Sequence, residues 1–81
     1  MLLPSPHNSQ DWLRQEFSAR QAKNRRYSQR AFARHLEIPS GRLSELLSGK
    51  RRLTASLARR LGMKLAYPPE KIEALVQLTE K

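Results

Sequence analysis

Residues 28–50 read SQRAFARHLEIPSGRLSELLSGK and predict two short helices separated by a tight turn. Ser28 can cap the first helix, because its hydroxyl can accept a backbone N–H that lacks a partner at a helix start. Pro39 cannot continue that helix, since it has no N–H and disfavours helical geometry in Ile38. Gly49 gives the second helix a residue suited to a left-handed C-terminal stop.

The apolar residues of this stretch follow helical spacing on both sides of the turn. They recur at intervals of three and four, which places them on one face of each helix. Ile38, between the helices, would hold the turn against the same core. The inward residues are Phe32, Ala33 and Leu36 in the first helix, and Leu43, Leu46 and Leu47 in the second, which begins near Ser40.

The whole stretch resembles the helix-turn-helix of phage-repressor-like (Xre/Cro type) DNA-binding domains. The likeness rests on Ser28-Gln29 at the helix start, on Phe32-Ala33 where the second helix crosses closely, and on the ending Ser48-Gly49-Lys50. Glu37 departs from the glycine that usually follows the first helix, and non-glycine residues in a left-handed conformation are uncommon. Gly41 is a second departure, because glycine weakens a helix.

The resemblance covers roughly residues 13–78 and implies an all-α fold, a compact lambda-repressor-like domain of five helices with the motif at about residues 28–49. We expect a domain at residues 9–81, preceded by a flexible arm at residues 1–8, where two prolines stand without periodicity. A weaker likeness links the chain to the N-terminal part of larger bacterial transcriptional regulators. That likeness leaves open whether these residues are a whole protein or one domain of a longer one.

A helix is expected before the motif. Helical periodicity begins at Ser9 or Asp11 and runs to about Lys23. Asp11 suits its start, both as a cap and as an anion at the positive helix end. Trp12 is interpreted as cover for the core rather than as a base-stacking residue.

Two more helices are expected after the motif. Thr54 suits the cap of a helix that runs to Leu61, with Gly62 as its stop. Pro69 suits the first turn of the last helix. That helix has more apolar positions than one inward stripe needs, so some apolar surface should remain for a partner. We expect a monomer or weak homodimer that pairs on DNA, or docks a missing C-terminal domain through this helix. Its apolar residues are Ile72, Leu75, Val76 and Leu78.

The basic charge is concentrated around the motif. The chain's net charge is +9, but residues 20–64 hold thirteen of the sixteen Lys and Arg and only two of the seven acids, a net charge of +11. An ordinary solvated surface can explain a charge run, whereas a basic segment beside a helix-turn-helix is typical of a phosphate footprint. The chain has no cysteine and no run approaching the roughly 20 apolar residues that span a bilayer. We therefore expect a cytoplasmic protein without a membrane partner.

The resemblance implies that the second helix, at about Ser40–Ser48, enters the major groove of double-stranded DNA. Arg42 can pair with guanine, and Glu45 can accept a hydrogen bond from cytosine. Alternatively, Glu45 forms an ion pair with Arg42, three residues away on the same helix. The positions that reach bases in the family are occupied here by Ser40, Gly41, Arg42, Ser44 and Glu45.

Phosphate contacts are expected on both sides of that helix. Gln29 matches a family residue that donates to a phosphate at a helix N-terminus, and residues 50–52 occupy the loop that contacts the backbone in related domains. Tyr27 either packs beneath the motif or hydrogen-bonds a phosphate, and His35 is interpreted as exposed. The predicted phosphate contacts are Gln29, Arg30, Lys50, Arg51, Arg52, Tyr27 and Arg26.

The sequence offers no assembly of catalytic residues. It contains no pair of carboxylates, nucleophile with a nearby base or metal-ligand spacing that would form a site, so we expect neither an enzyme nor a cofactor or metal. Two other functions remain open. An RNA-binding module would want exposed aromatic residues, for which Trp12, Tyr27 and Tyr67 are the candidates. A protein-interaction domain would dock through the last helix.

Overall fold

The computed structural model describes residues 8–79, which form an all-α domain with no strand in that range. The expected fold class and the expected number of helices are therefore confirmed. The arm expected at residues 1–8 lies outside the described residues except for Asn8. The helices are α1 (Ser9–Lys23), α2 (Gln29–Leu36), α3 (Ser40–Ser48), α4 (Ala55–Lys64) and α5 (Pro69–Thr79).

Polar side chains cap three of the helix starts. Ser28 accepts the Ala31 N–H at 3.0 Å, as predicted for α2. Thr54 caps α4 in the same way. The prediction that Asp11 caps α1 is wrong, because the Asn8 side chain accepts the Asp11 N–H at 2.8 Å. Asp11 lies inside the first turn, where its charge still faces the positive helix end.

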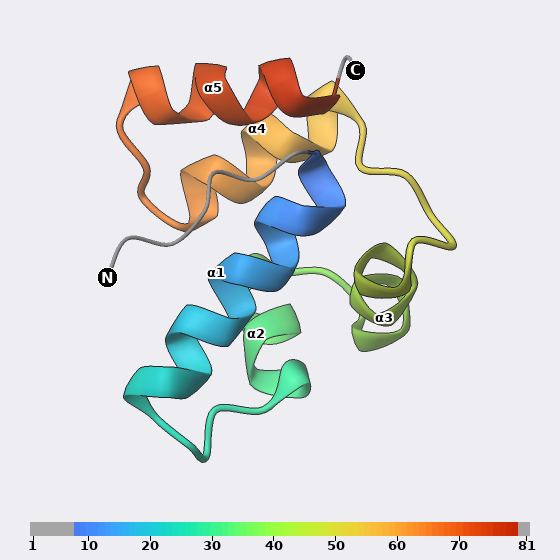
Figure 1. Ribbon diagram of the computed structural model, residues 1–81, viewed down its shortest axis with the longest axis vertical. Helices are drawn as coiled ribbons and strands as arrows, with labels where there is room; N and C mark the ends of the chain where they lie inside the picture. Colours follow the sequence, from blue (N-terminus) through green and yellow to red (C-terminus); the bar gives the residue numbers. More distant parts are fainter. Residues whose placement is uncertain (1–7, 80–81) are drawn as a thin grey trace.

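The helices form two pairs joined by α1 (Figure 1). The pair α4 and α5 packs side by side, and the pair α2 and α3 contains the tight turn, while α1 contacts both α3 and α5. The core lies where these elements meet, and Trp12 contributes to it as expected, with 8% of its surface exposed. The largest fully buried side chains are Phe32, Leu13, Leu36, Leu43, Leu46 and Leu61.

Gly62 does not end α4, contrary to the prediction. The helix continues past Leu61 to Lys64, and Gly62 is buried within it. A Cβ at Gly62 would lie 2.9 Å from Cγ1 of Ile72, so the missing side chain lets α5 approach α4 closely. After the C-cap Leu65, Ala66 adopts the left-handed conformation, with φ 59°. The Tyr67 N–H then bonds the Gly62 carbonyl, as in the usual glycine-terminated helix end.

The apolar surface expected on α5 is mostly covered by the domain itself. Leu75 and Val76 are buried, and Ile72 and Leu78 are half-buried against the core. What α5 leaves for a partner is the exposed part of Ile72 and Leu78, and docking there stays a prediction. Among residues 8–79, the large hydrophobic side chain left exposed is that of Met63 on α4. Within the same range, no helix is both long enough and apolar enough to cross a membrane.

Candidate nucleic-acid interface

Helix α3 divides its residues sharply between the core and solvent. Leu43 and Leu46 are buried, and Leu47, which was expected to point inward, is only half-buried. Helix α3 follows Pro39 as its N-cap residue, and no side chain caps its first backbone N–H groups. Of the five predicted base contacts, Ser40, Gly41, Arg42 and Ser44 are exposed, and Glu45 is partly exposed.

The turn before α3 accommodates Glu37 in the place of glycine. Glu37 adopts the left-handed conformation, with φ 58° and ψ 44°. Its N–H and that of Ile38 bond the last carbonyls of α2, among them that of Ala33. Helix α2 therefore ends by the same hydrogen-bond pattern as α4, also without glycine. This closure directs the chain into Pro39, and so fixes where α3 begins relative to α2.

A contact with α4 holds the Glu37 side chain. The Lys64 ammonium lies 2.6 Å from the Glu37 carboxylate. This hydrogen bond and the charge of Lys64 lower the pKa of Glu37, and the charge of Arg60 lowers it further. Although the side chains are largely exposed, the pair connects the turn of the motif to the C-terminal end of α4.

Glu45 pairs with Arg51 and not with Arg42. The two side chains lie 3.2 Å apart, each about half exposed, and the Arg51 N–H also bonds the Glu45 carbonyl. The alternative that Glu45 pairs with Arg42 is wrong, because the chain folds back after Gly49 and brings Arg51 to the carboxylate. One predicted base contact and one predicted phosphate contact are thus partners in the free domain. Arg42 has no ion-pair partner within residues 8–79.

The predicted phosphate contacts differ in their accessibility. Arg26, Arg30, Lys50 and Arg52 are exposed, and Gln29 is half-buried at the first position of α2. Tyr27 is a different case, because its hydroxyl is buried and has no hydrogen-bond partner within the described residues. The Tyr27 ring packs 6.1 Å from Phe32 and 6.3 Å from Phe17. Of the two roles considered for Tyr27, the packing of its ring agrees with the first, and a phosphate contact by the hydroxyl stays a prediction.

Most of the basic side chains on this side of the domain are not neutralised. Four ion pairs connect basic residues to acids within residues 8–79, and they engage Arg20, Arg51, Arg59 and Lys64. The remaining basic side chains around α2 and α3 have no carboxylate within ion-pair distance in that range. Mutual repulsion of these like charges is relieved when they face an anion. The basic side chains without an ion-pair partner in that range are Lys23, Arg25, Arg26, Arg30, Arg34, Arg42 and Lys50.

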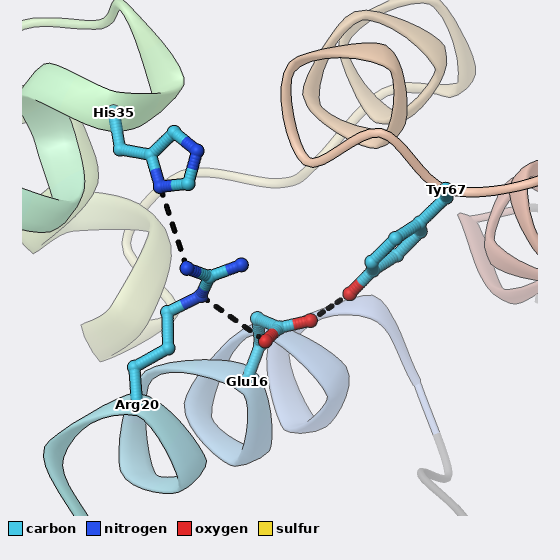
Figure 2. Close-up of polar contacts among 4 residues, drawn as sticks. All are labelled: Glu16, Arg20, His35 and Tyr67. Carbon is cyan, nitrogen blue, oxygen red and sulfur yellow. Dashed lines mark hydrogen bonds and ion pairs between the residues drawn. The ribbon is translucent and has the colours of Figure 1, made fainter. Parts of the chain in front are cut away.

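The structure also assembles a polar network that sequence reasoning did not detect (Figure 2). Glu16 on α1 pairs with Arg20 at 3.2 Å and accepts a hydrogen bond from the Tyr67 hydroxyl, while Arg20 contacts His35 Nδ1 at 3.4 Å. The spacing of Glu16 and Arg20 is a recognisable helical pair. His35 is exposed, as predicted, but its partner on α1 could be found only from the fold.

This network connects α1 with α2 and with the loop before α5. Both carboxylate oxygens of Glu16 are engaged, one by Arg20 and one by Tyr67. The hollow beside Glu16 and Tyr67 is lined by neither Arg20 nor His35. Among residues 8–79 no three His, Asp or Glu side chains are grouped so that they could hold a metal ion. The network therefore braces α1 against α2 and against the loop before α5.

Two residues of α1 reach the candidate interface from outside the basic segment. Gln10 and Arg14 both donate to the backbone carbonyl of Leu47, near the end of α3. No local pattern in the sequence indicates this contact, since 33 residues or more separate the partners.

Comparisons of the chain with family models, with curated proteins and with solved structures find no match.

Proposed function

We propose that this domain binds double-stranded DNA sequence-specifically, as the helix-turn-helix domain of a bacterial transcriptional regulator acting in the cytoplasm. The observation that carries the proposal is the free polar face of α3. This nine-residue helix buries two leucines and presents its other side to solvent, and a helix of this width enters the major groove, which is about 12 Å wide. The residues on that face are Ser40, Gly41, Arg42, Ser44 and the partly exposed Glu45.

The surroundings of α3 support the same proposal. Lys50 and Arg52 are exposed in the loop that follows it. Arg30 is exposed in the first turn of α2, beside the partly buried Gln29. We assign these four residues, together with Arg26 and Arg51, to the phosphate backbone, and the α3 face to base edges. Phosphate contacts position a protein on the duplex, whereas base contacts specify the sequence.

The other functions receive less support from the fold. Stacking on single-stranded RNA requires accessible aromatic rings, but Trp12 is buried, and the rings of Tyr27 and Tyr67 are half-buried against the core. Docking of a protein through α5 requires apolar surface, whereas Leu75 and Val76 are buried within the domain. We therefore propose a monomer or weak dimer in solution that pairs on duplexes carrying two half-sites about one helical turn apart.

Selection of bound sequences from random duplexes tests the proposal. We expect an enriched sequence, and an affinity whose logarithm falls with log salt at a slope near −5 if about five or six phosphates are neutralised. An RNA of the same length should compete poorly, and sedimentation should give two domains per two-site duplex. If no sequence is enriched, the proposed base contacts are contradicted. If the salt slope is shallower than about −2, the proposed phosphate contacts are contradicted as well.

A charge-matched pair of variants sharpens the test. Arg42→Ala and Arg59→Ala each remove one positive charge, but Arg59 pairs with Glu73 on α5, away from α3. We expect Arg42→Ala to weaken binding to the selected sequence more than Arg59→Ala does. Equal losses from the two variants would mean that only net charge matters, and would contradict base readout by α3.

A further inference from the structure

The C-terminal end of α3 is closed by side chains from another helix. The last carbonyls of a helix have no partners within it and are satisfied by water or by side chains. At the end of α3 the Gln10 contact is partly buried and the Arg14 contact is exposed. The Leu47 carbonyl accepts two side-chain hydrogen bonds from α1, from Gln10 Nε2 at 3.0 Å and from Arg14 Nε at 2.9 Å. Two residues earlier, the Glu45 carbonyl accepts from the Ser48 hydroxyl and from the Arg51 N–H.

Gly49 brings the end of α3 against Gln10. It ends the helix in the left-handed conformation, with φ 87°. A Cβ at this position would lie 2.9 Å from Gln10 Nε2 and 3.1 Å from Gln10 Oε1. The glycine therefore serves two needs, the backbone angle and the space for the Gln10 amide.

Arg14 adds a charge to the same contact. Its guanidinium lies at the negative end of the α3 dipole, where a cation is favourable. A hydrogen bond with a charged donor is roughly twice as strong as a neutral one. Arg14 is the one Lys or Arg among residues 1–19, so it stands apart from the basic segment that includes the motif. The hydrogen bond of Arg14 to the end of α3, and not membership of the basic segment, accounts for a basic residue at this place on α1.

We propose that Gln10 and Arg14 are positioning residues that set the angle at which α3 is presented to DNA. Helix α3 has Leu43 and Leu46 fully buried, and its start is held by the Glu37 turn, while apolar contact is not directional. Hydrogen bonds are directional, and the two at Leu47 tie the helix end to α1. Recognition needs side chains held to within about 0.5 Å and 10–20°. The inference rests on the proposed function, because it assigns α1 a role in base reading.

Spin-label distances test the positioning without DNA. The chain has no cysteine, so Ser18→Cys on α1 and Ser44→Cys on α3, both at exposed positions, can be labelled selectively. Gln10→Met and Arg14→Met keep side-chain length but remove the donors. Gln21→Met is the matched control, because Gln21 also donates from α1 to a carbonyl, that of Tyr27, at 3.2 Å. We expect the label-to-label distance distribution to broaden in the first two variants and not in the control.

The second measurement is the ratio of affinities for the selected and the random duplex. We expect Gln10→Met, which leaves the charge unchanged, to lower this ratio about fivefold or more, while random-duplex affinity stays within about twofold. Gln21→Met should leave the ratio unchanged. Distributions as narrow as in the control, or broadening without any loss of the ratio, would each overturn the proposal. If no duplex is preferred, the proposed function fails, and the distances still decide separately whether Gln10 and Arg14 hold α3.

Discussion

Replacing Gly62 with alanine tests the close packing of α4 against α5. The new Cβ would lie 2.9 Å from Cγ1 of Ile72, whereas carbon atoms are in optimal contact at about 3.5–4.0 Å. Relieving such an overlap in a packed core typically costs about 1–3 kcal/mol. Against this, alanine in place of glycine stabilises a helix interior by about 1 kcal/mol. We therefore expect Gly62→Ala to lower the free energy of unfolding by about 1 kcal/mol.

Two further variants separate the steric cost from the helix propensity. Gly41→Ala is the control, because nothing lies within 4 Å of a Cβ at that position of α3, so we expect it to stabilise by up to about 1 kcal/mol. In an Ile72→Ala background the obstructing Cγ1 is gone. There Gly62→Ala should reverse sign and stabilise the domain. The difference between the two backgrounds measures the contact itself.

Urea unfolding followed by circular dichroism supplies the free energies. For a small domain with a slope near 1 kcal/mol per molar, a change of about 1 kcal/mol moves the midpoint by about 1 M. Stabilisation by Gly62→Ala in the otherwise unchanged chain would refute the close approach of Ile72. The same effect of Gly62→Ala in both backgrounds would show that the helix propensity alone governs this position.

Three other predictions concern side chains around the motif. Arg42→Ala should cost about 1–3 kcal/mol on the selected duplex and relax preference at one base pair, as measured by competition against single-base variants. Glu45→Gln should free Arg51 from its ion pair, so affinity for random duplexes should rise and the salt slope should steepen by about one, whereas weaker random binding would contradict this. Because the folded-state pKa of Glu37 is lowered by Lys64, its contribution to stability is present above the ordinary Glu pKa of about 4.3 and is lost as pH falls through the lower folded value. The free energy of unfolding of Lys64→Met, measured by urea unfolding at each pH, should therefore fall less steeply over that acidic range than that of the unchanged domain. Identical pH profiles of the two proteins would show that the ion pair does not contribute to stability.

The helix starts and the inward faces of the motif could be predicted from local chemistry. Ser28 and Thr54 are caps because their hydroxyls reach an N–H three residues on, which is a property of the chain segment alone. Phe32 and Leu43 are buried as their helical spacing predicted. The exposure of Arg42 and of residue 44 follows from the same spacing, since they lie off the apolar face. The use of that face on DNA stays a prediction.

The ends of helices and the partners of charged side chains could not be predicted in this way. Asn8 takes the cap that Asp11 was expected to provide, because the helix begins at Ser9 and Asp11 already lies within its first turn. Gly62 looked like a stop, but its use depends on Ile72, a residue that only the pairing of α4 with α5 brings near. Glycine propensity alone does not distinguish a helix end from a close helix contact.

The sequence by itself determined the all-α class, the two helices of the motif and the concentration of basic charge around them, because spacing, capping and charge are local quantities. Only the tertiary structure decided that Glu45 faces Arg51 and that the Tyr27 hydroxyl is covered. It also placed Gln10 and Arg14 against the end of α3. Gln10 and Arg14 lie 33 residues or more from Leu47, so their meeting depends on how the intervening helices pack. Glu45 and Arg51 meet because the chain folds back after Gly49, which no local pattern predicts.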